Sequence, residues 1–185
     1  DMDKVTERYT DLITDQLDDD DFKKGDKEKV KIDGESKKIK PVTLTISREK
    51  AKKTTVAALK KAKNDNELLR LSNMNEKDYN KSIKDALKDA QDAQDKDFPK
   101  IESKIYQEKH QILKRDITIT DSDDKKTTIK GTNKIDDDLK VDYKVSGNDN
   151  TFEINGTSKK KDDNYKDKYT LTSSIDYDRY TVDID

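Results

Sequence analysis

The stretch that decides the fold is LKVDYKVSGNDNTFEING, residues 139–156. Apolar residues alternate with polar ones from Leu139 to Val145, which is the pattern of a strand with one buried face. Gly147-Asn148 is a turn signal, and the alternation resumes from Phe152 to Gly156. The stretch therefore predicts a β-hairpin with one apolar and one polar face.

The same period of two residues continues outward on both sides of this hairpin. Turn-forming clusters at Glu108–Gln111 and Asp121–Asp124 separate the earlier apolar runs. After the hairpin, apolar residues fall on odd positions over 169–175 and on even positions over 180–184, so we expect a turn or bulge near 177–179 to reset the face. Residues 99–185 therefore predict an antiparallel β-meander.

Residues 1–98 have mainly the period of amphipathic helices. Apolar residues recur at spacings of three and four over 1–17, about 48–63 and about 76–96, with a short Leu-rich helix between the last two. Ser47 and Asn75 are residue types that cap helix N-termini, and Asn64 with Glu67 forms a capping-box pattern.

One β-hairpin interrupts these helices. Val30 and Ile32 precede Gly34, and alternating apolar residues follow from Ile39 to Ile46. Pro41 has no N–H for a sheet ladder, so we expect it at an edge or at the start of its strand. We predict a single α+β domain over residues 1–185, a curved antiparallel β-meander with one face covered by amphipathic helices.

This order of elements resembles a known group of proteins. The segment Val30–Leu71, followed by a long helix and a one-sided sheet, is similar to uncharacterised extracytoplasmic proteins and lipoproteins of low-GC Gram-positive bacteria. Residues 100–185 also resemble the half-barrel of bacterial lipoprotein-carrier proteins, a family whose concave face holds acyl chains. The resemblance implies a place at the cell envelope and assigns no functional residue.

Composition excludes several chemistries. The chain of 185 residues has 44% charged residues, a net charge of -2 and no Cys, which excludes disulfides, thiol nucleophiles and Cys-ligated metals. No apolar stretch is long enough to cross a membrane. The chain opens at Asp1-Met2, so we expect that an upstream segment has been removed, which permits export. The resemblance to envelope proteins implies an extracytoplasmic location, with the protein secreted or anchored through that upstream segment.

Candidate catalytic and metal-binding residues are few. His110 is the only histidine and lies in a charged turn, where nothing would orient it for catalysis. The Asp clusters 18–21, 121–124 and 136–138 lack the spacing of a calcium loop, since Lys126 and Thr132 stand where that motif needs Gly and Glu. We therefore predict no catalytic residue, no metal site and no cofactor.

Residues 26–65 carry 13 basic and 6 acidic groups, a net charge of +7. Lys52, Lys53, Lys60 and Lys61 are the candidate surface-binding residues within this segment, for an anionic membrane or wall polymer. Arg is scarce and no aromatic residue lies among these lysines, so nucleic acid is not the expected partner. The alternative is the solvated face of an amphipathic helix.

These observations favour a non-enzymatic binding or interaction domain at the bacterial cell envelope. Its partner would be an envelope protein, a wall polymer or a lipid. One alternative is a carrier that encloses a lipid or another apolar ligand between sheet and helices. A hydrolase is the other alternative.

Overall fold

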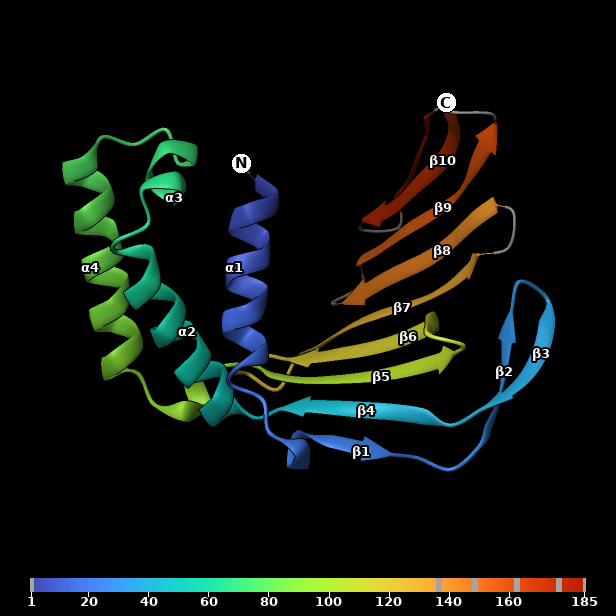
Figure 1. Ribbon diagram of the computed structural model, residues 1–185, viewed down its shortest axis with the longest axis horizontal. Coiled ribbons are helices and arrows are strands. Elements are labelled where there is room, and N and C mark those ends of the chain that lie inside the picture. The colour runs from blue at the N-terminus through green and yellow to red at the C-terminus, as the bar shows by residue number, and fades with distance from the viewer. Residues whose placement is uncertain (1, 136–137, 148–149, 162–163, 176–177, 185) are drawn as a thin grey trace. The chain divides into compact units, whose positions relative to one another are not determined.

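The computed structural model describes residues 2–135, 138–147, 150–161, 164–175 and 178–184 (Figure 1). The chain divides into two compact units. The helical unit contains Asp1–Asp19 and Ile46–Lys100, and the sheet unit contains Asp20–Thr45 and Ile101–Asp185. The β-hairpin expected among the helices thus belongs to the sheet unit. The expectation of a single domain over residues 1–185 stays a prediction.

The helices begin where capping side chains accept hydrogen bonds from the first backbone amides. Ser47 accepts from the Lys50 N–H at 3.2 Å and Asn75 from the Asp78 N–H at 2.9 Å, so both predicted caps are confirmed. The helices are α1 (Met2–Thr14), α2 (Arg48–Ala62), α3 (Asn66–Leu71) and α4 (Glu76–Asp92), with short 3₁₀ turns at Asp19–Asp21 and Asp95–Asp97. None of the helices described is long and apolar enough to cross a membrane.

One predicted cap is wrong by one residue. Asp65, and not Asn64, caps α3, because its carboxylate accepts from the Glu67 and Leu68 N–H groups, each at 3.1 Å. Asn and Asp cap helices about equally well, so the residue types alone do not distinguish the two positions. The extended backbone at Asp65 (φ -97°, ψ 95°) is what marks the start of the helix.

Small residues bring α2 and α4 together in the helical unit. Ala51 of α2 and Ala90 of α4 are buried with Phe98, and half-buried Val56 and Leu59 pack against them. Tyr79 on α4 is also buried and donates its hydroxyl hydrogen to the Ala62 carbonyl at 2.7 Å. That bond satisfies a carbonyl at the C-terminus of α2, which has no partner within its own helix.

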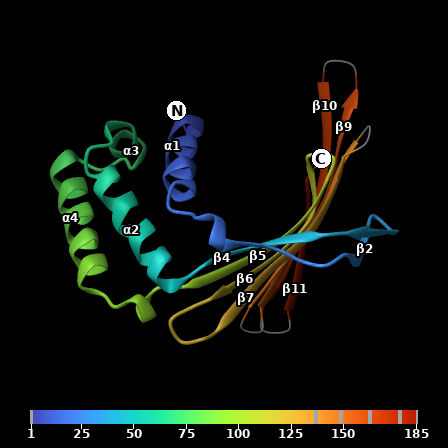
Figure 2. The same ribbon diagram turned by 60° about the horizontal axis from the view of Figure 1, so that its bottom comes forward.

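The sheet unit is built on an antiparallel sheet of nine strands in the order β1-β4-β5-β6-β7-β8-β9-β10-β11. Its strands are β1 (Phe22–Lys24), β4 (Pro41–Ile46), β5 (Lys100–Glu108), β6 (Gln111–Thr120), β7 (Lys126–Ile135), β8 (Asp138–Gly147), β9 (Asn150–Lys161), β10 (Asn164–Ile175) and β11 (Asp178–Ile184). Figure 2 shows the curvature of this sheet. The α+β class and the curved meander are confirmed; that helices cover one face of the sheet stays a prediction.

The strand register confirms the alternation predicted for the meander. Val145 stands opposite Phe152, as the hairpin predicted over residues 139–156 implies. Leu171 of β10 stands opposite Val182 of β11, so odd positions face even ones and the reset of the face is confirmed. Residue 177, where part of that reset was expected, lies outside the described residues.

The predicted N-terminal hairpin is shorter than expected. Among the residues described, strands β2 (Glu28–Ile32) and β3 (Glu35–Ile39) pair only with each other, whereas β4 pairs with β1 in the large sheet. Pro41 is the first residue of β4, as predicted.

The β2–β3 hairpin is fixed within the sheet unit by a small core. Val30, Ile32 and Ile39 form a buried cluster with Tyr106 and Leu113 of the large sheet. At the rim of the cluster, Glu28 accepts hydrogen bonds from the Lys104 ammonium and, at 2.7 Å, from the Tyr106 hydroxyl. These contacts hold the turn of the hairpin, Asp33-Gly34, in a fixed place in the sheet unit.

Candidate functional site

The polar face of the sheet brings side chains from four strands into register. Thr132, Asp142, Asn155 and Thr170 are successive cross-strand partners on β7, β8, β9 and β10. Two residues along, Lys140, Thr157 and Lys168 form a second row on β8, β9 and β10. Residues directly opposite one another in an antiparallel pair share a face, and neighbouring strands lie about 4.8 Å apart.

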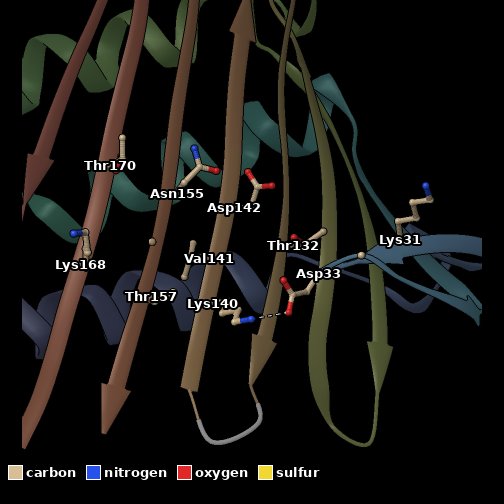
Figure 3. A pocket seen from close by; sticks show the side chains of 12 residues that line it. Lys31, Asp33, Thr132, Lys140, Val141, Asp142, Asn155, Thr157, Lys168 and Thr170 are labelled. Carbon is tan, nitrogen blue, oxygen red and sulfur yellow. Dashed lines mark hydrogen bonds and ion pairs between the residues drawn. The ribbon is translucent and has the colours of Figure 1, made fainter. Parts of the chain in front are cut away.

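These two rows form one wall of a cavity of about 660 Å³, which we call the polar groove (Figure 3). The turn of the β2–β3 hairpin forms its other wall. Asp33 in that turn has a φ of 49° and Gly34 a φ of 81°, which is the backbone conformation of a tight hairpin turn. Asp33 Oδ2 accepts from Lys140 Nζ at 3.0 Å and so joins the hairpin to the first wall.

The lining of the polar groove is rich in both hydrogen-bond donors and acceptors. It contains Lys31, Asp33, Gly34, Thr132, Lys140, Val141, Asp142, Asn155, Gly156, Thr157, Lys168 and Thr170. Threonine hydroxyls donate and accept, lysines donate, and the carboxylate of Asp142 accepts. No aromatic side chain is among the described lining residues. The volume lies within the range of about 300–1,000 Å³ that is usual for ligand sites.

The charges of the polar groove nearly cancel. Three lysines and two aspartates line it, which leaves a net charge of +1. Lys140 and Asp33 neutralise each other in their ion pair. The groove therefore suits a ligand with many hydroxyl groups better than one with a high net charge, because each hydroxyl both donates and accepts.

The structure separates the four lysines predicted to bind a surface. Lys52, Lys53 and Lys60 line one cavity of the helical unit, of about 580 Å³, together with half-buried Val56 and Ala57. Lys61 lines a different cavity, beside Arg8 and Glu67. The surface-binding role of these lysines stays a prediction.

Two of those lysines have partners inside the helical unit. Lys52 Nζ donates to the carbonyl of Ala93, the C-cap of α4, at 2.5 Å. Lys53 Nζ lies 2.7 Å from Glu49 Oε1, and the hydrogen bond that Lys53 donates to Glu49 raises the pKa of Lys53. A cation beside the last carbonyls of a helix is stabilising, so Lys52 has a structural role in the fold.

A second polar cluster joins α1 to the start of α3. The Arg8 guanidinium donates to both carboxylate oxygens of Asp65, at 3.0 and 2.8 Å, and to Glu67 at 2.6 Å. Burial alone would raise the pKa of Asp65, whose side chain is 7% exposed, but hydrogen bonds from the Leu68 N–H and Arg8 outweigh burial and lower it. The Tyr9 hydroxyl also donates to Asp65 at 3.3 Å. The polar groups of this cluster form hydrogen bonds with one another, so the cluster stabilises the fold.

The remaining sequence candidates lie in segments that connect helices and strands. His110 is exposed, with a φ of 65° in the turn between β5 and β6. The Asp121 carboxylate accepts from the Asp123 and Lys125 N–H groups, each at 2.9 Å, and thus shapes its own turn. Asp18 pairs with Lys50 at 2.7 Å, and residues 136 and 137 lie outside the described residues. Among the side chains that the structure describes, no three acidic or histidine groups are placed to hold a metal ion.

Sequence reasoning missed the polar groove entirely. The signal was present as the polar residues that alternate with apolar ones in β8 and β9, such as Asp142 and Asn155. Only the strand register shows that these positions meet in one row. In comparisons with known proteins, no family model, curated protein or solved structure matches this chain.

Proposed function

We propose that this protein is a non-enzymatic binding domain of the bacterial cell envelope, and that its polar groove holds a hydroxyl-rich polymer, a wall glycan. The single observation that carries the proposal is the row Thr132–Asp142–Asn155–Thr170, which crosses four strands in register. Three intervals of about 4.8 Å make that row about 14 Å long. An extended chain of sugar units can lie along a row of that length.

The polarity of the groove favours a glycan over a lipid. An acyl chain would cover the polar groups of Lys31 and Asp142 without offering them a hydrogen bond, and burying a polar group without a hydrogen bond is costly. Sugar hydroxyls can replace the water around those groups. Extracytoplasmic wall glycan is also the ligand that agrees with the localisation expected from the sequence.

A binding role is favoured over hydrolysis by the state of the carboxylates. Hydrolysis of a glycosidic bond uses a pair of carboxyl groups, one on each side of that bond. In the polar groove Asp33 is held by Lys140 at 3.0 Å, which leaves Asp142 as the other lining carboxylate. The groove residues are therefore proposed as ligand contacts, with no catalytic role.

The test is co-sedimentation of the purified chain with insoluble peptidoglycan. We expect Asp142→Ala/Asn155→Ala to weaken binding by at least about tenfold, because each lost hydrogen bond costs about 0.5–1.5 kcal/mol and tenfold corresponds to 1.4 kcal/mol. The matched control is Asp123→Ala/Asn150→Ala, which changes exposed residues of the same types outside the lining. Equal weakening in both double variants, or no binding by the unaltered chain, would contradict the proposal.

The salt dependence of binding separates a glycan from an anionic polymer. Hydrogen bonds to sugar hydroxyls are little affected by ions, so we expect the bound fraction to change little between 50 and 500 mM salt, about a threefold change in the screening length. A steep loss of binding with salt would instead assign the attachment to lysines, and a Lys60→Gln/Lys61→Gln variant would then lose it.

A further inference from the structure

The polar groove is blocked at one end. Its lining residues come from strands β7 to β10 and from the β2–β3 hairpin, and no described residue of β5 or β6 is among them. Figure 3 shows Thr170 at one end of the row and the hairpin turn, with Asp33, beyond Thr132 at the other. The row of cross-strand partners therefore runs into the hairpin and does not continue across the sheet.

The residues under the hairpin explain why the row stops at β7. The next cross-strand partner of Thr132 is Lys114 on β6. The ammonium nitrogen of Lys114 lies 5.3 Å from the centre of the Tyr106 ring. Tyr106 is 2% exposed and is buried in the cluster that contains Val30 and Ile32 of the hairpin. A ligand that lies along the row therefore meets the hairpin directly after Thr132.

The hairpin is attached to the sheet at several points. At its base, Glu28 accepts the hydrogen bonds described above. Along β3, Lys37 Nζ donates to Glu108 Oε2 at 3.0 Å, and at the tip Asp33 accepts from Lys140 at 3.0 Å. Together with the buried cluster, these contacts make the hairpin a fixed wall of the groove.

We infer that the polar groove takes the end of a wall-glycan chain and not its interior. This inference rests on the proposed function and adds which part of the polymer is bound. A sugar inside a chain has a neighbour on both sides, so an internal stretch lying along the row would have to pass through the hairpin. A terminal sugar has a hydroxyl in place of one neighbour and can lie against the hairpin at Thr132, while the rest of the chain leaves past Thr170.

The binding capacity of the glycan tests the inference. Isothermal titration calorimetry with soluble, peptide-free peptidoglycan strands measures the moles of protein bound per gram of glycan. Cutting each strand once doubles the number of ends, so the bound moles per gram should double while the dissociation constant stays the same. An unchanged capacity per gram would overturn the inference and leave the proposed function in place. An absence of binding to both preparations would contradict the proposed function as well.

A substitution in the hairpin turn tests the closed end at one residue. Gly34 lines the groove, and a β-carbon added to it meets no atom within 4 Å, so a side chain there adds bulk without displacing protein atoms. Asn tolerates the positive φ of this position. Gly34→Asn should raise the dissociation constant for strand ends at least about tenfold, because bulk at the closed end clashes with the terminal sugar.

The matched control is His110→Asn, which places the same residue at a positive φ in the exposed turn between β5 and β6, outside the lining. Its dissociation constant should equal that of the unaltered chain. Unchanged binding by Gly34→Asn, or an equal loss in both variants, would overturn the inference.

Discussion

The ring of Tyr143 lies directly over Gly131, its cross-strand partner on β7. Gly131 is buried, and a β-carbon added there would overlap the ring carbons of Tyr143. The same arrangement recurs between Gly156 and Tyr169. An aromatic ring that covers a strand glycine compensates for the missing side chain and fixes the register of the two strands.

Gly131→Ala should therefore destabilise the sheet unit by about 1–3 kcal/mol, the usual cost of overpacking. The measurement is urea unfolding followed by circular dichroism. Removal of the ring in Gly131→Ala/Tyr143→Val should recover part of that loss, because the added methyl group then has room. A Gly131→Ala chain as stable as wild type would contradict the close approach of ring and backbone.

The cap of α3 gives a prediction with a built-in control. Asp65→Ala removes the acceptor for two backbone N–H groups and should lower the unfolding free energy by about 0.5–2 kcal/mol. Asn64→Ala, one residue earlier, removes no capping bond and should change it by less than about 0.5 kcal/mol. Thermal melts of the two variants distinguish them, and an equal loss for both would refute the assignment of the cap.

Alkaline pH should destabilise the helical unit through Tyr9. Burial, followed by the neighbouring Asp65 charge, raises the pKa of Tyr9 to about 12. The unfolded chain loses that phenolic proton at about pH 10, so the stability that Tyr9 contributes is complete below pH 10 and is lost as the pH rises towards 12. Tyr9→Phe should lose less stability than wild type between pH 10 and 12, measured by denaturant titration. Identical pH profiles would refute this role.

Lys52 and Lys60, two of the four lysines predicted to bind a surface, should respond differently to substitution. Lys52→Met removes the bond to the Ala93 carbonyl and should cost about 1 kcal/mol. Lys60→Gln changes an exposed side chain and should be within about 0.5 kcal/mol of wild type. Chemical denaturation of both variants is the check. A near-neutral Lys52→Met would mean that its hydrogen bond contributes nothing to the fold.

Local features of the fold were predictable because local chemistry determines them. Ser47 and Asn75 cap their helices through bonds to amides three residues away, so the sequence holds all the information needed. Alternation likewise predicted the Val145–Phe152 pairing across a tight turn. Alternation does not specify which strands pair, however, and for this reason the predicted N-terminal hairpin includes the β4 residues, which pair with β1 instead.

The polar groove was not predictable because it depends on long-range register. Thr132 and Thr170 lie 38 positions apart in the chain and share a row only because two intervening strands pair without a slip. The sequence points instead to the lysines of α2, because a run of charged residues is visible along the sequence. The structure then assigns one of them, Lys52, to the end of α4.

The measurement that tests the central claim most directly is a backbone amide NMR titration of the full chain with a soluble peptidoglycan glycan fragment. The account predicts that the largest shift changes fall on the row Thr132, Asp142, Asn155 and Thr170 and on the turn at Asp33, and that Asp142→Ala/Asn155→Ala abolishes them. Shift changes confined to α2 around Lys60, or none at millimolar glycan, would contradict it.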